Sequence, residues 1–166
     1  MRMEYAAMKS TNTQTLALLS MLTALSIALS YLHLPTPTGI LTLLDVGICF
    51  TAFYLGKREG AIVGGLSALL CDLLLGYPQW AFFSLLFHGA QGYFAGWAGK
   101  NRLIGLVLSS LSMVGGYFLA TIWLYDLSSA VQGSIGNLLQ QLAGLVGGYV
   151  LLQAIKQIGG IRHVAK

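Results

Sequence analysis

Charged side chains are scarce in this sequence. Asp, Glu, Lys and Arg together make up 8% of the 166 residues, whereas a soluble domain carries about 25%. Hydrophobic residues make up 56%, and the mean hydropathy is +0.74. So few charges are hard to reconcile with a water-facing surface, and the composition predicts an integral membrane protein in a lipid bilayer. The net charge of +4 is spread over short loops without forming a patch, so we expect no nucleic-acid partner.

Motifs for catalysis and for nucleotide hydrolysis are missing as well. The chain contains no G-x-x-x-x-G-K-[ST] phosphate loop, no H-E-x-x-H and no G-x-S-x-G. We therefore predict no catalytic residue and no cofactor, and the energy for any transport must come from a partner or a gradient. The two cysteines, Cys49 and Cys71, lie inside apolar segments. They are interpreted as small buried hydrophobic residues rather than as a metal site or a disulfide.

The sequence contains six apolar segments, each long enough or nearly long enough to cross a membrane. A hydrocarbon core of about 30 Å needs about 20 helical residues. The predicted helices span approximately residues 12–32, 40–56, 59–76, 79–97, 103–125 and 134–156. The second segment has a vague start and contains Asp45. We predict an all-α protein whose residues 1–166 form a single bundle of six transmembrane helices.

The basic residues predict the orientation of this bundle. They precede the first helix, separate the second from the third and the fourth from the fifth, and follow the sixth. They are Arg2, Lys9, Lys57, Arg58, Lys100, Arg102, Lys156, Arg162 and Lys166. With six spans they all fall on one side, which the positive-inside rule makes cytoplasmic. We expect both termini in the cytoplasm and the bundle in a prokaryotic plasma membrane.

The opposite loops hold all three prolines, Pro35, Pro37 and Pro78. Proline lacks a backbone donor and tends to end helices. The longest outer connection covers residues 32–44, and its Pro-Thr-Pro-Thr-Gly core predicts an ordered turn that acts as a lid over a cavity. No Lys or Arg lies in the outer half, so an acidic ligand is disfavoured.

Polar side chains inside the predicted helices indicate a binding site, because such groups are costly in lipid and usually face a cavity or a partner. Counted at 1.5 Å per residue, His88, Tyr117 and Gln141 lie about 9–13 Å below the outer surface. The predicted substrate-binding residues are Tyr77, Trp80, Ser84, His88, Gln91, Tyr117, Asn137, Gln140 and Gln141. Alternatively, the aromatic residues anchor the chain at the membrane interface, and the amides bond neighbouring helices. Aromatic rings with His, Asn, Gln and Tyr suit a small, flat heteroaromatic ligand.

Small residues form a stripe along the first predicted helix, at Ser20, Ala24 and Ala28. In lipid, small residues spaced by four let two helix backbones approach closely. Internal packing explains most such pairs in this glycine-rich chain. On a terminal and otherwise Leu-rich helix, the stripe predicts docking to another protein.

Three stretches carry a resemblance to a known family. They are residues 35–47 (PTPTGILTLLDVG), the segment from Gly56-Lys-Arg-Glu-Gly60 to Asp72-Leu-Leu-Leu-Gly-Tyr-Pro-Gln-Trp80, and His88-Gly-Ala-Gln-Gly92. The chain resembles the substrate-binding S components of energy-coupling factor (ECF) vitamin transporters, in particular the subgroup linked to hydroxymethylpyrimidine and pyridoxine.

The resemblance implies six helices and an outer vitamin pocket that draws on the fourth, fifth and sixth helices and is roofed by the first outer loop. It implies a transmembrane coupling (T) protein and two ATPase subunits as partners. The family's Ala-xxx-Ala docking element matches Ala24 and Ala28. We therefore predict a vitamin-capturing subunit of an ABC-type importer rather than an enzyme.

Three alternatives remain at this stage. One is an intramembrane enzyme that uses His88 with Asp72, although the two residues lie at different depths in the six-helix arrangement. The others are a structural subunit without a small ligand, and a small carrier that works alone.

Overall fold

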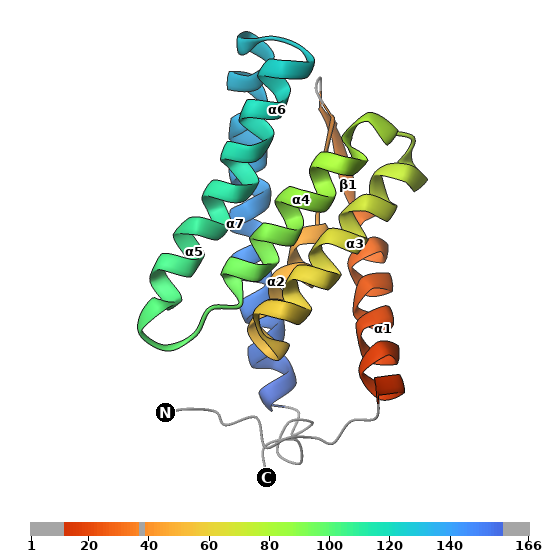
Figure 1. Cartoon of the computed structure of the whole chain (residues 1–166), viewed down its shortest axis with the longest axis vertical. Coiled ribbons are helices and arrows are strands. Elements are labelled where there is room, and N and C mark those ends of the chain that lie inside the picture. Colours follow the sequence, from red (N-terminus) through yellow and green to blue (C-terminus); the bar gives the residue numbers. More distant parts are fainter. Residues whose placement is uncertain (1–11, 37–38, 158–166) are drawn as a thin grey trace.

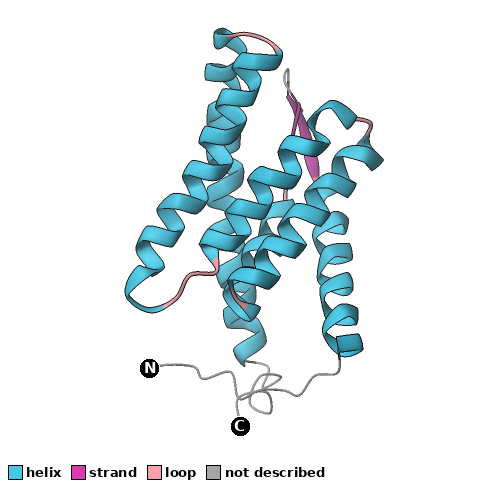
Figure 2. Ribbon diagram, viewed as in Figure 1, coloured by secondary structure: helices cyan, strands magenta, loops and turns pink. Residues whose placement is uncertain are grey.

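The computed structural model describes residues 12–36 and 39–157 (Figure 1). Helices dominate, and one short hairpin interrupts them (Figure 2). The elements are α1 (Asn12–Ser30), β1 (His33–Thr36), β2 (Gly39–Thr42), α2 (Leu44–Leu55), α3 (Lys57–Leu75), α4 (Pro78–Ala95), a 3-10 turn (Gly99–Asn101), α5 (Arg102–Ser110), a π-helical turn (Leu111–Gly115), α6 (Gly116–Leu124) and α7 (Leu127–Gln157).

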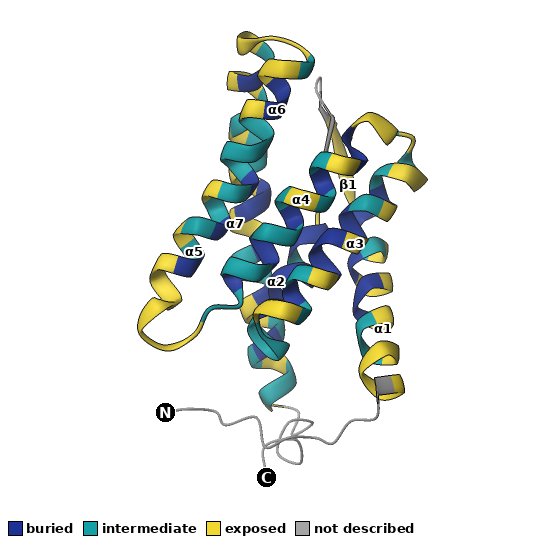
Figure 3. Ribbon diagram, viewed as in Figure 1, coloured by how far each residue is buried: buried dark blue, intermediate teal, exposed yellow. Residues whose placement is uncertain are grey.

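The segments from the 3-10 turn through α6 continue as one rod, Gly99–Leu124, so the described residues form six helical rods. Three of these are long and apolar enough to cross a membrane, namely Thr13–Ser30, Gly99–Leu124 and Leu127–Gln157. Helix α2 is apolar but has only 12 residues. It forms the centre of the protein, since eight of its residues are buried, whereas the outward faces of the long helices are exposed (Figure 3).

The outer connection differs from the all-α prediction, because part of it is β-structure. Residues 40–42, which we expected to begin the second helix, belong to strand β2, which pairs antiparallel with β1 in the register Leu34↔Leu41. Pro35 disfavours helix here and is tolerated in an isolated two-stranded hairpin. The hairpin is tied to α7 because the Thr42 backbone N–H donates to Gln140 Oε1 at 2.8 Å. Pro37 lies outside the described residues.

Helix α7 begins at Leu127, seven residues before the predicted start at residue 134. Asp126 explains the difference: its Oδ1 accepts the backbone N–H of Ser129 at 2.7 Å, which satisfies a free donor of the first turn. That hydrogen bond from Ser129 also lowers the pKa of the Asp126 carboxyl. The first two turns of α7 mix Ser and Gln with apolar residues, so the apolar pattern alone did not place the start of the helix there. The other helix ends, apart from the start of α2, lie within two residues of the prediction.

The two ends of the bundle differ in character (Figure 1). The hairpin lies at the end that holds the α3–α4 and α6–α7 connections. The opposite end holds the α2–α3 and α4–α5 connections, which carry Lys57, Arg58, Lys100 and Arg102. The remaining basic residues except Lys156, namely Arg2, Lys9, Arg162 and Lys166, lie outside the described residues.

Helices α3 and α4 pack backbone to backbone through glycines. A Cβ atom on Gly60 would lie 2.6 Å from the carbonyl oxygen of Gly92, and a Cβ on Gly92 would collide with the backbone of Gly60. Helices α7 and α2 pack in the same way, because a Cβ atom on Gly148 would lie 2.7 Å from the backbone nitrogen of Phe50. Small residues thus set the helix separation. The main apolar cluster, formed by Leu22, Phe50, Val63 and Leu152, lies where α1, α2, α3 and α7 meet.

The glycine contact predicts a stability difference within α4. Gly92→Ala is expected to lower the thermal midpoint by several degrees, because backbone atoms of Gly60 cannot move aside for the new methyl group. Gly89→Ala is the matched control on the same helix, since its Cβ would lie 3.6 Å from the nearest atom, an ordinary contact. Thermal melting of both variants in detergent, followed by circular dichroism, measures the difference. Equal midpoints would contradict this account of the α3–α4 packing.

Candidate functional site

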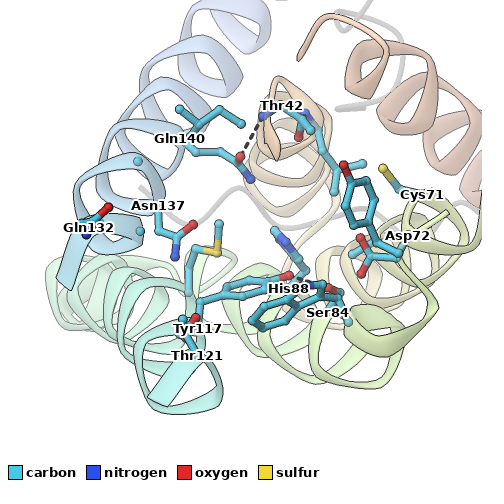
Figure 4. Close-up of a pocket in the computed structure, with 18 residues that line it drawn as sticks. Thr42, Cys71, Asp72, Ser84, His88, Tyr117, Thr121, Gln132, Asn137 and Gln140 are labelled. Atoms are coloured by element: carbon cyan, nitrogen blue, oxygen red, sulfur yellow. Dashed lines mark hydrogen bonds between the residues drawn. The ribbon is translucent and has the colours of Figure 1, made fainter. Parts of the chain in front are cut away.

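A cavity of about 120 Å³ opens between the hairpin, α3, α4, α6 and α7 (Figure 4). Its lining comes from segments that are far apart in sequence, from Leu41 on β2 to Gln140 on α7. The cavity therefore exists only because the hairpin turns back over the helices and α7 runs alongside α6.

Seven of the nine sequence-predicted binding residues line this cavity. They are Tyr77, Trp80, Ser84, His88, Tyr117, Asn137 and Gln140. Pro78 at the first position of α4 fixes the start of that helix. From this start, Ser84 and His88 follow Trp80 at four-residue intervals, so all three project from one face. Tyr117 comes from α6, and Asn137 and Gln140 come from α7.

Gln91 and Gln141 were predicted to contact a ligand together with the other seven residues, but the structure does not place them in the lining of this cavity. Both side chains are fully buried, at 0% exposure. Gln91 Nε2 donates to Gln141 Oε1, and Gln141 Nε2 donates to the hydroxyls of Ser109 and Ser110, both at 3.2 Å. Gln91 lies one helical turn beyond His88, and Gln141 directly follows Gln140. Both side chains are held by hydrogen bonds between helices instead of reaching the cavity.

Aromatic rings form one wall of the cavity. The Trp80 ring lies 5.6 Å from the Tyr117 ring and 6.1 Å from the Tyr125 ring, centroid to centroid. The Tyr117 hydroxyl is hydrogen-bonded to the Ser84 hydroxyl, and the Tyr117 ring meets the His88 imidazole edge to face at 5.7 Å. Trp80 is only 6% exposed, so its neighbours hold the ring in place, and it lies nearly parallel to Tyr125 and tilted by 47° to Tyr117.

Sequence reasoning missed several lining residues. Thr42, Asp72, Met113, Thr121 and Gln132 also contribute to the lining. Asp72 lies near the end of α3, and Thr42 belongs to a strand where the sequence predicts the start of a helix. The sequence pattern could not identify Met113 as a lining residue, because a methionine in an apolar segment looks the same as its lipid-facing neighbours. Its burial, at 1% exposure, follows from the π-helical turn that contains it.

Asp45 lies behind the cavity and was also missed as a functional candidate. Its carboxylate is 0% exposed and approaches His88, with Oδ1 3.1 Å from Nδ1. The two groups are in close electrostatic contact, and neither carboxylate oxygen has a directed hydrogen-bond partner in the described part of the chain. A charged residue inside an apolar segment was the signal that could have identified it.

The electrostatics of the lining disfavour an anionic ligand. It contains Asp72 and no Lys or Arg, and Asp72 Oδ2 is buried without a hydrogen-bond partner among the residues that the structure describes. Within residues 12–36 and 39–157, no group of three His, Cys, Asp or Glu side chains could hold a metal ion. The arrangement suits binding of a neutral or weakly cationic ring that offers hydrogen-bond donors.

Comparisons with known proteins agree with this picture. Residues 10–157 match the family model of the ECF-type riboflavin transporter S component. The chain is 43% identical over 156 residues to the thiamine precursor transporter HmpT of Lactococcus lactis subsp. cremoris (strain MG1363), covering 92% of this chain and 93% of the relative. It is 33% identical over 135 residues, 77% and 90% of the two chains, to a Pyrococcus woesei protein described as an uncharacterized protein in the gap 3′ region.

A solved structure shares the fold. It is described as the structure and mechanism of the S component of a bacterial ECF transporter, and it matches with a TM-score of 0.64 at 21% identity. The match covers 91% of this chain and 98% of the other. The resemblance predicted from sequence is confirmed, and the chain belongs to the ECF-type riboflavin transporter S-component family, whose members are helical membrane subunits of transporters rather than enzymes.

Proposed function

We propose that the protein captures a single-ring heteroaromatic vitamin or precursor of the hydroxymethylpyrimidine or pyridoxine class from outside the cell. It then delivers this molecule through a complex powered by partner ATPases. ECF S components work with a T component and ATPases. Two ATPase subunits and one T protein are the partners proposed for this chain.

The size of the cavity is the observation that carries the proposed substrate class. One water needs about 10–15 Å³ of such space, so a cavity of about 120 Å³ holds roughly ten water-sized groups. A six-membered ring with a few small substituents fills that space. Riboflavin, with three fused rings and a ribityl chain, exceeds it, although the matching family model bears its name. The relative named as a thiamine precursor transporter supports the smaller ligand.

The chemistry of the lining supports the same class. The ring would pack against the aromatic side chains of Trp80 and Tyr117, which lie next to each other in the lining. Hydroxyl, amine and ring-nitrogen groups would meet His88, Asn137 and Gln140. Asp72 in the lining opposes a phosphorylated form, because two negative charges would face each other without a basic residue between them.

We propose six membrane spans with both termini in the cytoplasm, in a prokaryotic plasma membrane. The clustering of Lys57, Arg58, Lys100 and Arg102 at one end of the bundle supports this orientation under the positive-inside rule. The hairpin that borders the cavity lies at the opposite end (Figure 1). The cavity would therefore open toward the outside, with the hairpin as its lid.

We propose that Ser20, Ala24 and Ala28 dock the T component. All three are exposed on α1, opposite Leu22, Thr23 and Ser26, which face the bundle. A stripe of small side chains on an outward face leaves room for another helix to approach closely.

Ligand binding can be tested on the purified full chain. Native mass spectrometry after exposure to hydroxymethylpyrimidine, pyridoxine and riboflavin is expected to show retention of a single-ring vitamin and not of riboflavin. His88→Ala and Asn137→Ala are each expected to weaken that binding about tenfold or more, because each removes a hydrogen-bonding group from the cavity lining. Leu138→Ala is the matched control, since Leu138 neighbours Asn137 on α7 but is exposed. The proposed site is wrong if both cavity variants bind as tightly as the control.

A further inference from the structure

A chain of polar side chains leads away from the cavity through α4, α7 and α5. His88 Nδ1 lies 2.8 Å from Gln91 Oε1, and Gln91 Nε2 donates to Gln141 Oε1. Gln141 Nε2 then donates to the hydroxyls of Ser109 and Ser110. His88, Gln91, Gln141 and Ser109 are buried. The hydrogen bonds join α4, α7 and α5. Among the side chains in this chain, only His88 also belongs to the cavity lining.

Asp45 meets this chain at His88 from the other side. Its Oδ1 atom lies 3.1 Å from His88 Nδ1, in the one contact between a carboxylate and a basic side chain found within the described residues. The carboxylate is 0% exposed, and Gly144 of α7 packs directly against its Cβ atom. A buried carboxylate without a compensating partner is strongly unfavourable. The His88 imidazole is the group that provides this compensation.

The carboxylate determines which way every hydrogen bond in the chain runs. An ionised carboxylate this close to Nδ1 favours a hydrogen on that nitrogen, and Gln91 Oε1 accepts it. Gln91 must then present its oxygen to His88 and its amide nitrogen to Gln141. Gln141 in turn presents its oxygen to Gln91 and its nitrogen to the serine hydroxyls. The observed contacts have this order throughout.

The same arrangement leaves the other ring nitrogen, Nε2, for the ligand. Both partners of Nδ1, Asp45 and Gln91, lie outside the cavity lining, whereas His88 belongs to it. The ring therefore turns its Nδ1 edge away from the cavity, and Figure 4 shows His88 lying among the lining side chains between Asn137 and Asp72. In the neutral imidazole with Nδ1 protonated, Nε2 is an acceptor for a donor group on the ligand.

We propose that Asp45 is a positioning residue that, from outside the cavity, holds a proton on His88 Nδ1 and so presents Nε2 to the ligand. The expected effect of Asp45 on ligand affinity rests on the proposed function. The tautomer is a property of the protein without ligand and can be measured independently. The other titratable groups that face His88 are Asp72 and Cys71 on α3 and Tyr117 on α6, which border the same cavity.

The test uses the full-length protein labelled with ¹⁵N-histidine, in detergent and without ligand. The chain has three histidines, and His88→Gln identifies the His88 resonances by their loss. In the wild type, Nδ1 is expected to resonate in the protonated range. In Asp45→Ala, the form protonated at Nε2 is expected to predominate, and Asp45→Asn is expected to show a mixture. Asp126→Asn, at the exposed start of α7, is the control and should match the wild type.

Binding of a hydroxymethyl-aminopyrimidine probe, measured by calorimetry, completes the test. Both Asp45 variants are expected to lose about 10- to 100-fold in affinity although residue 45 does not line the cavity. An unprotonated Nδ1 in the wild type overturns the proposal, even if neither variant folds. Wild-type tautomer and affinity in Asp45→Asn would overturn it as well. If the wild type has Nδ1 protonated but binds no single-ring vitamin, the proposed substrate class fails while Asp45 keeps its assigned role.

Discussion

Trp80→Ala is expected to weaken binding of the single-ring ligand about 100-fold. Trp80 is buried against Tyr117 and Tyr125 and forms the centre of the aromatic wall. Its removal would delete the stacking surface and let water into the site, and buried tryptophans are frequent hot spots of binding energy. Isothermal titration calorimetry on the purified protein would measure the loss.

Trp123→Ala is the matched control for this substitution. Trp123 is 75% exposed on α6 and does not line the cavity, so its truncation should leave affinity within about twofold of the wild type. Trp80→Phe should fall between the two, because a smaller ring keeps part of the stacking area. Equal affinities for Trp80→Ala and Trp123→Ala would contradict the assignment of the aromatic wall to ligand binding.

Ala24→Trp combined with Ala28→Trp is expected to abolish vitamin uptake by cells while leaving ligand affinity unchanged. The two alanines are exposed on α1 and do not line the cavity. Two indole groups would prevent a partner helix from approaching the backbone, so the subunit could still bind ligand but could not join the complex. Uptake of labelled vitamin and co-purification of the T component measure the two consequences separately.

Two controls separate docking from general damage. Leu119→Trp places an indole group at an exposed position of α6 and should leave uptake intact. Ala24→Gly with Ala28→Gly preserves the close approach and should keep uptake near that of the wild type. If the tryptophan variant still co-purifies with the T component and transports normally, docking does not occur at this stripe.

Local patterns in the sequence were sufficient to locate the helices and much of the site. Long apolar segments must become helices in lipid, because every backbone polar group has to be satisfied internally. The four-residue spacing of Trp80, Ser84 and His88 placed them on one face whatever the rest of the fold did. Where an element depended on capping by one side chain, as α7 depends on Asp126, the apolar pattern placed the helix end wrongly.

Contacts between distant segments could not be obtained from such patterns. Gln91 and His88 are equivalent as polar residues on α4, yet only His88 reaches the cavity. The difference arises because α7 brings Gln141 against Gln91. Asp45 was recognised as an anomaly in an apolar segment, but its partner His88 lies on another helix.

The sequence alone thus determined that this is a helical membrane protein with polar residues facing inward, because composition and helical period act locally. Its motifs also identified the family. The tertiary structure alone decided the size of the cavity, the hairpin beside it and the Asp45–His88 pair. The physical reason is that glycine contacts between helices, such as Gly60 with Gly92 and Gly144 with Asp45, set how closely and at what rotation the helices pack. That packing determines which polar groups meet each other and which remain free for a ligand.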